Sequence, residues 1–256
     1  MPDLSLVDLS ALAWAALAVG ALTIGISKTA IPGANIAIAL FAMVLPAKPS
    51  TAAVLLLLIV GDLFALWFYR RHADWTVLRR LVPPVIAGVA VGAVFLAYAS
   101  NDLVGRVIGA ILISVISLGL VQRWRVARRA DQVQPHPSAG WAQAAAYGSL
   151  GGFTTMVANA AGPVMSMYFL AVRLPVTTFL GTSAWFFFVI NVTKVPFALG
   201  LGLVSPQLLL IDLILVPFVV VGAFLGRVLI RYLSQRVFEW TVIVASIAGA
   251  VYLLVR

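Results

Sequence analysis

Two lysines lie inside apolar stretches of the sequence, where a charged side chain needs a partner. Lys28 stands in the run GISKTAIPGAN at 25–35, and Lys194 stands in FFFVINVTKVPFALG, two positions before Pro196. An ammonium group persists at membrane depth with a counter-ion, with water or with a negatively charged ligand. The two lysines therefore predict an anion-binding site. The alternative is that each lysine extends to a membrane interface.

Uncharged polar groups accompany both lysines. Pro32 and Gly33 interrupt the helical pattern after Lys28, and a helix that begins near Pro32 directs its positive end into the gap. The other hydrogen-bonding candidates all lie in or beside an apolar run: Asn35, Thr154, Thr155, Asn159, Gly162 and Asn191. We predict that these groups bind the oxygens of an anion. For the threonines and Asn159, a hydrogen bond to a carbonyl of their own helix is the alternative.

Two carboxylates also fall within apolar runs. Asp62 follows Gly61 in LLLLIVGDLFALWFYR and needs a partner or a proton at that depth. Two interpretations stay open: a structural ion pair with Lys28 or Lys194, or a carboxylate that couples transport to a proton. Asp212 is expected in the second turn of a helix capped by Ser205, extending toward an interface.

The elements that position these residues are predicted to be membrane helices. Of 256 residues, 63% are hydrophobic and 10% are charged, and the mean hydropathy is +1.10, so polar surface for a water-soluble globule is lacking. This composition predicts an all-α polytopic membrane protein with the lipid bilayer as solvent. Apolar runs fall at about 10–27, 31–46, 50–69, 81–99, 103–122, 141–158, 160–173, 178–199, 206–227 and 237–255. The second and seventh runs are short, which predicts broken or re-entrant helical hairpins.

Several other functions are excluded by composition. The chain has no cysteine and only two histidines, His72 and His136, both in predicted loops, so we expect no metal, no cofactor and no enzyme. The net charge of +9 comes from residues between the apolar runs, which indicates membrane topology and no nucleic-acid partner. A homo-oligomer stays open.

The basic residues predict an orientation in the plasma membrane. If the segments alternate from an external N-terminus, twelve of the 17 basic residues fall on one side: Arg70, Arg71, Arg79, Arg80, Arg123, Arg125, Arg128, Arg129, Arg173, Arg227, Arg231 and Arg236. The positive-inside rule assigns that side to the cytoplasm. Both termini then lie outside, and 123–140 forms a cytoplasmic linker.

An ordered set of matches predicts an internal repeat. Gly25 matches Gly152, and the pairs that follow in the same order are Pro46 and Pro175, Pro83 and Pro217, Gly88 and Gly222, and Gly92 and Gly226. The repeats are 1–122 and 141–256, each with five segments. Because five is odd, the second repeat enters the membrane from the opposite face, so the repeats are inverted. Such proteins bind substrate near the midplane, between the repeats.

At these residues the sequence resembles the TauE/SafE sulfite exporter family. The resemblance covers nearly the whole chain and rests on short stretches: G-x-x-K-x-x-x-P-G from Gly25 to Gly33, T-A-A from Thr51, Gly61-Asp62, Asn159 to Pro163, and Asn191 to Pro196. It implies a plasma-membrane carrier for sulfite, sulfonates or related sulfur oxyanions, with some members linked to other organic anions. Two alternatives stay open: a ten-segment metabolite or drug carrier of another family, and a membrane scaffold that transports nothing.

Overall fold

The computed structural model describes residues 9–29, 34–128, 141–172, 174 and 176–229. Within these ranges the chain is helical and contains no strand. The helices are α1 (Ala11–Thr29), α2 (Asn35–Val44), α3 (Ala47–Tyr69), the 3-10 helix η2 (Arg70–His72), α4 (Trp75–Tyr98), α5 (Asn101–Arg128), α6 (Trp141–Ala158), α7 (Ala161–Ala171), α8 (Val176–Gly200) and α9 (Pro206–Leu229). The predicted all-α class is therefore confirmed.

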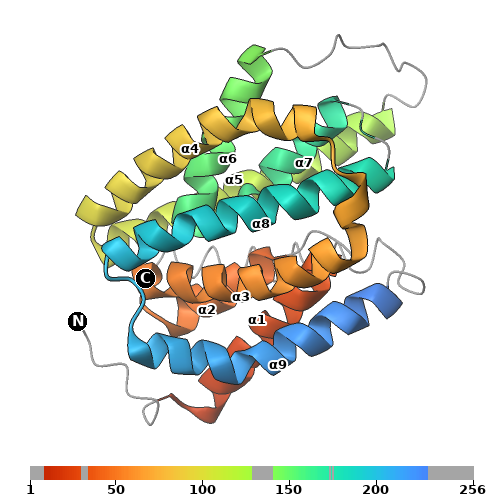
Figure 1. The fold of residues 1–256 in the computed structure, drawn as a ribbon. Helices are drawn as coiled ribbons and strands as arrows, with labels where there is room; N and C mark the ends of the chain where they lie inside the picture. Colours follow the sequence, from red (N-terminus) through yellow and green to blue (C-terminus); the bar gives the residue numbers. More distant parts are fainter. Residues whose placement is uncertain (1–8, 30–33, 129–140, 173, 175, 230–256) are drawn as a thin grey trace.

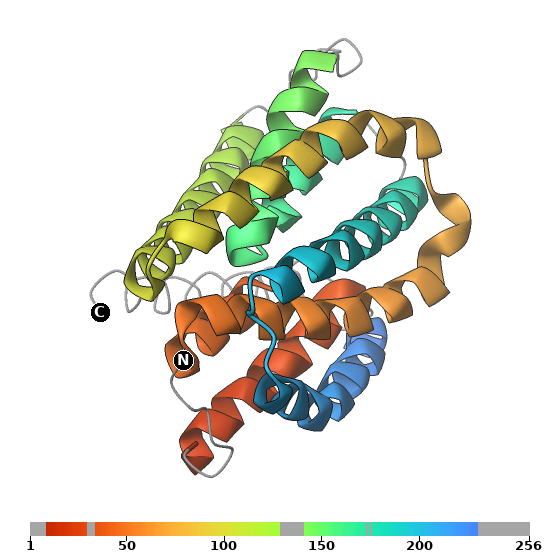
Figure 2. The same ribbon diagram turned by 60° about the vertical axis from the view of Figure 1, so that its left-hand side comes forward.

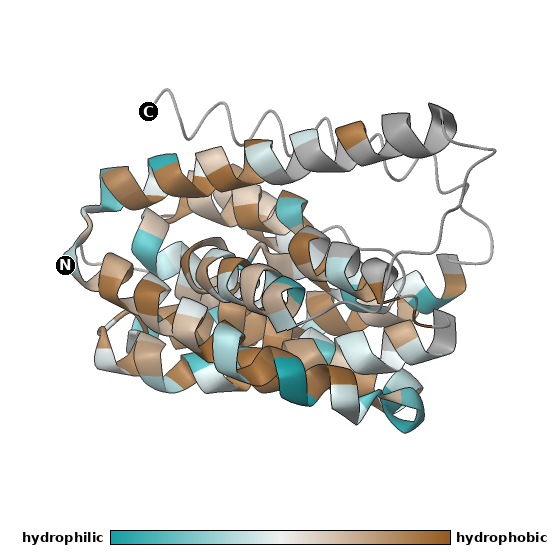
Figure 3. Ribbon diagram, turned by 90° about the horizontal axis from the view of Figure 1, so that it is seen from above, coloured by the Kyte–Doolittle hydropathy of each residue, from teal (hydrophilic) through white to brown (hydrophobic). Residues whose placement is uncertain are grey.

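Among the described residues, five helices are long and apolar enough to cross a membrane: Ala11–Thr29, Ala47–His72, Trp75–Tyr98, Gly181–Gly200 and Pro206–Val228. Figure 3 shows that apolar residues predominate on most of the described helices. The second and seventh segments are short helices, α2 with 10 residues and α7 with 11, as their apolar runs predicted. The predicted run at 237–255 lies outside the described residues.

Two helices extend well beyond their apolar runs at one end. The helix α4 begins at Trp75 and not near 81, because the Asp74 carboxylate caps it by accepting from the backbone N–H groups of Thr76 and Val77. The helix α5 continues to Arg128, past the end of its apolar run at 122. In both cases, polar turns continue a helix at the end of a membrane segment.

The helices form two groups, with α8 between them. Figures 1 and 2 show α4, α5, α6 and α7 in one group and α1, α2, α3 and α9 in the other. The groups do not follow the order of the sequence: α9, from the second half, packs on α1, and α4, from the first half, packs on α6. The helix α3 contacts α1, α2 and α6, which flank the two predicted breaks.

Glycines allow the closest helix contacts. A Cβ atom added to Gly25 on α1 would lie 2.1 Å from the carbonyl oxygen of Val219, and one added to Gly222 on α9 would lie 2.1 Å from that of Leu22. The same arrangement recurs between α4 and α6 at Gly88 and Gly152. Any larger side chain at these four positions would push the two backbones apart.

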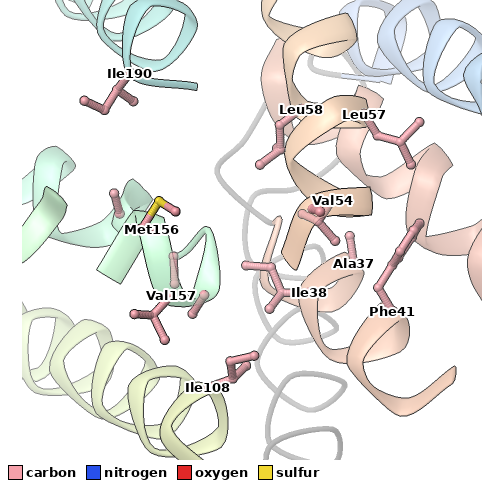
Figure 4. Close-up of a cluster of buried hydrophobic side chains, with 14 of the residues drawn as sticks. Ala37, Ile38, Phe41, Val54, Leu57, Leu58, Ile108, Met156, Val157 and Ile190 are labelled. Carbon is pink, nitrogen blue, oxygen red and sulfur yellow. The ribbon is translucent and has the colours of Figure 1, made fainter. Parts of the chain in front are cut away.

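Buried apolar side chains fill the space between the two groups. Figure 4 shows Ile108, Met156, Val157 and Ile190 on one side, and side chains of α2 and α3 on the other, including Val54 and Leu58. This contact holds α3 against α6 and α8. These three helices carry Asp62 and most of the polar residues that the sequence predicts to bind an anion.

Candidate functional site

Four helices bring the predicted polar residues together. Lys28 lies at the end of α1, Asp62 lies within α3, and Thr155 lies in the last turn of α6. The helix α8 carries both Asn191 and Lys194, and a spacing of three puts both side chains on one helix face. Each of these two residues is 1% exposed.

The first part of the site is an ion pair with an amide. The Lys28 Nζ atom lies 2.6 Å from Asp62 Oδ1, and Asn191 Nδ2 donates to Asp62 Oδ2 at 2.7 Å. Both carboxylate oxygens are therefore engaged, one by a cation and one by an amide. The Lys28 Nζ atom also lies 4.7 Å from the centre of the Phe187 ring, which adds a cation–π contact.

Gly61 leaves room for this ion pair. A Cβ atom at Gly61 would lie 2.8 Å from Lys28 Cγ, so the lysine stem runs directly over the glycine. The Gly61-Asp62 pair thus has a physical basis: the glycine admits the lysine stem, and the next residue supplies the opposite charge.

The second part of the site holds Lys194 through neutral oxygens only. The Lys194 Nζ atom donates to Thr155 O at 2.9 Å, to Thr155 Oγ1 at 3.0 Å and to Asn159 Oδ1 at 2.7 Å. A lysine ammonium has three N–H groups, so these three contacts use all of them. The Thr155 carbonyl belongs to the C-terminal end of α6, where the helix dipole is negative and favours a cation.

Asn159 sits at the break between α6 and α7. Its φ is 53°, a left-handed conformation that asparagine adopts more readily than most residues. While its side-chain oxygen accepts from Lys194, its Nδ2 donates to the Thr51 carbonyl on α3 at 2.9 Å. The helix break is therefore tied to both Lys194 and α3.

The two parts together carry a formal net positive charge. They hold two ammonium groups and one carboxylate, and among the described residues no second carboxylate contacts either lysine. The Asn191 Oδ1 atom is buried without a hydrogen-bond donor. No group of three metal-binding side chains occurs in the described ranges.

Other candidate residues do not join these contacts. Thr154 Oγ1 donates to the carbonyls of Leu150 and Gly151, the self-bonding alternative. Asn35 opens α2 partly exposed, and no atom lies within 4 Å of a Cβ added to Gly162 on α7. Pro32 and Gly33 lie outside the described residues.

Sequence reasoning missed the contact of Phe187 with Lys28 and misplaced Asp212. Phe187 precedes Asn191 by four positions and Lys194 by seven. This spacing places all three residues on one face of α8 and could have indicated that Phe187 belongs to the site.

Ser205 caps α9 as expected, accepting from the backbone N–H of Leu208 at 3.1 Å. The prediction that Asp212 extends to an interface is wrong, because its side chain is 5% exposed.

Comparison with known proteins identifies the family. The family model described as sulfite exporter TauE/SafE matches residues 13–253, nearly the whole chain. No curated protein and no solved structure matches significantly. The family consists of membrane transporters and not of enzymes. The chain is therefore an integral membrane protein and belongs to the sulfite exporter TauE/SafE family.

Proposed function

We propose that this protein is a secondary transporter of a small sulfur-containing anion: sulfite, a sulfonate or a related oxyanion. The observation that carries the proposal is the buried charge. Lys28 and Lys194 lie in one polar cluster of four helices, and Asp62 balances only one of them. A negatively charged solute is the partner that this cluster lacks.

Charge and burial explain why an anion is preferred. Leaving an ionised group buried without a counter-charge costs several kcal/mol, even after the protein relaxes. The neutral oxygens around Lys194 reduce this cost but add no negative charge. An anion of charge −1 neutralises the cluster, whereas a cationic solute would add to an existing excess of positive charge.

The two lysines play different roles in this proposal. All three N–H groups of Lys194 are already used, so Lys194 acts mainly through its charge. Lys28 has one carboxylate partner and the Phe187 ring, so it has N–H groups to offer to an entering anion. Of the two roles open for Asp62, we favour the ion pair, since both of its oxygens are engaged and an anion would compete with it for Lys28.

The inverted repeat is part of the same proposal. In an inverted repeat, α1 corresponds to α6 and α4 to α9, so the pairing of α1 with α9 should mirror that of α6 with α4. The close approaches of Gly25 to Gly222 and of Gly152 to Gly88 follow this rule. The Asp62–Asn191 hydrogen bond then lies between corresponding positions of α3 and α8.

We also propose that the arginine-rich end of the molecule is cytoplasmic. Arg70 and Arg71 lie in η2, Arg79 lies in the first turns of α4, and the Arg227 guanidinium lies 4.3 Å from the Phe68 ring, so these residues gather at one end. Because the chain has no cysteine, a cysteine introduced by mutation is its only thiol, and labelling of that thiol shows on which side of the membrane the residue lies. An impermeant thiol reagent added outside intact cells should label D102C at the start of α5 and leave R71C unlabelled.

Transport by the purified protein tests the function. The full chain is reconstituted into liposomes, and uptake of labelled sulfite and labelled methanesulfonate is measured for the wild type, for K28M and K194M, and for K48M. Lys48 lies at the start of α3, outside the polar cluster, so K48M controls for the loss of a lysine. We expect flux in the wild type and K48M and at least a tenfold loss in K28M and K194M.

The outcomes separate the competing functions. Flux of a cationic or neutral metabolite, with none for either sulfur anion, would favour a carrier of another substrate class. No flux of any solute would favour a scaffold. Unchanged anion flux in both K28M and K194M would reject the roles assigned to these lysines, even if the protein transports sulfite.

A further inference from the structure

Asp212 is a second buried carboxylate, and it takes no part in the contacts of the anion site. It lies in the second turn of α9 with its side chain 5% exposed, and neither Oδ1 nor Oδ2 has a hydrogen-bond partner. It shares the inward face of α9 with Leu208, Ile211 and Leu215, which are fully buried. An acidic group in such surroundings requires an explanation.

No opposite charge compensates Asp212 within the described chain. The helix α9 packs against α1 and α3. The titratable residues on the described parts of these three helices, apart from Asp212, are Lys28 on α1, Lys48, Asp62 and Tyr69 on α3, and Arg227 on α9. Lys28 and Asp62 pair with each other, and none of the five forms a salt bridge with Asp212.

The protonated carboxyl fits this environment better than the carboxylate. An ionised carboxylate loses its hydration on burial and here receives no hydrogen bond in return. A protonated carboxyl needs only one acceptor, and carbonyls of the preceding helical turn accept from the hydroxyls of buried threonines, as in Thr23 to Val19 and Thr29 to Gly25. A metal cation would need several oxygen ligands around it.

Asp212 is separate from the anion site but connected to it through α1. Gly222 and Gly226 lie against Leu22 and Ile26 of α1, so α9 and α1 run in the same direction. Phe224 and Arg227 lie against Phe64 and Phe68 of α3, so α9 and α3 do so as well. Asp212 precedes Gly222 by ten positions, so it lies about 15 Å nearer the start of α9. The helix α1, against which α9 packs, carries Lys28 at its other end.

We propose that Asp212 is the proton-binding residue that couples anion movement to a proton gradient. This inference rests on the proposed transport function. The carboxylate takes up one proton from water on one side of the membrane, is occluded as the neutral acid in the packed state described above, and releases that proton to water on the other side. Release requires water to reach Asp212. Entry of water at this position separates α9 from α1 and so moves α1, the helix that carries Lys28.

Transport under a pH gradient tests the coupling. Liposomes containing the full chain are loaded at one pH and diluted into another, and accumulation of labelled methanesulfonate is measured, because the charge of this probe does not change with pH. Exchange of labelled for unlabelled methanesulfonate without a gradient is measured in parallel. In D212N we expect gradient-driven accumulation to fall at least tenfold while exchange stays within twofold of the wild type. The control D102N changes an exposed aspartate at the start of α5.

Further variants decide between coupling and a structural role. D212E keeps an ionisable group and should retain part of the gradient-driven accumulation. Full accumulation in D212N, loss of exchange in a folded D212N, or loss of coupling in D62N with D212N unaffected would each overturn the proposal. A sodium gradient that drives accumulation when the proton gradient does not would also overturn it.

An infrared measurement keeps the proposal testable if D212N fails to fold. The wild-type protein should show the carbonyl band of a buried protonated carboxyl, the band should persist in D62N, and it should shift in D212E. Absence of this band from the wild type would overturn the proposal. Wild-type protein that moves neither sulfite nor methanesulfonate under any condition would instead contradict the transport function itself.

Discussion

The Lys28–Asp62 ion pair predicts an asymmetric effect on stability. The Asp62 side chain is 1% exposed, whereas that of Lys28 is 11% exposed and also contacts Phe187. Removing one partner of a buried pair costs about 3–5 kcal/mol, because the other charge is left uncompensated. K28M leaves the more deeply buried charge with Asn191 as its hydrogen-bond donor, so we expect its cost near the upper end, about 4–5 kcal/mol. D62N leaves Lys28 with some water and the aromatic ring, and we expect about 2–3 kcal/mol after allowing for this exposure.

The double variant K28M/D62N separates the pair from the two single effects. It removes both charges and leaves none buried, so its cost should be at least about 2 kcal/mol less than the sum of the two single costs. The assay is reversible unfolding of the purified protein in mixed micelles, titrated with denaturing detergent. Additive costs, or a larger cost for D62N than for K28M, would refute the reasoning and indicate that the two charges do not stabilise each other in the membrane-embedded protein.

Three further predictions concern helix contacts and the helix break. In G25A the added Cβ would meet a backbone carbonyl of α9, so unfolding should become easier by about 1–3 kcal/mol, whereas G200A, at an open position, should leave stability unchanged or raised. N159D places a carboxylate against Lys194 and removes the Nδ2 donor to the Thr51 carbonyl, so it should abolish sulfite uptake in liposomes and lower the thermal midpoint. D74A removes the cap of α4 and should lower the unfolding free energy by about 1 kcal/mol in the same detergent titration.

The membrane-spanning elements could be predicted from the sequence, because bilayer thickness fixes their length. The runs at 10–27 and 178–199 correspond to α1 (Ala11–Thr29) and α8 (Val176–Gly200) with small shifts at the ends. The apolar run did not predict the start of α4, because the first turns of this helix, which carry Trp75, Arg79 and Arg80, are helical but not apolar. Asp74 is the local signal for that start, because aspartate is a favoured helix cap.

Sequence reasoning left Lys28 and Lys194 as alternative partners of Asp62 and could not decide between them, and it did not predict the oxygens that bind Lys194. Lys28 and Asp62 lie on different helices, and only the packing of α1 on α3 brings them within 2.6 Å. Thr154 and Thr155 are adjacent, yet one bonds to its own helix and the other binds Lys194, because a single step around a helix changes the face. The Thr51 carbonyl is a backbone group, so no residue type in the sequence marks it as the acceptor of the Asn159 amide.

The hydrogen bonds of the site also indicate which helices can separate during transport. Three hydrogen bonds of Lys194 connect α8 to Thr155 on α6 and to Asn159 at the helix break. Across to α3, the polar contacts of these elements are the Asn191–Asp62 bond and the Asn159–Thr51 bond. The Asn159–Thr51 bond joins two neutral groups, whereas the Asn191–Asp62 bond is charge-assisted through its carboxylate acceptor. Opening the boundary between α3 and the α6–α8 pair therefore breaks fewer polar contacts than separating α8 from α6. It also exposes Lys28 and Asp62 from one side while Lys194 stays bound, as rigid-body alternating access requires.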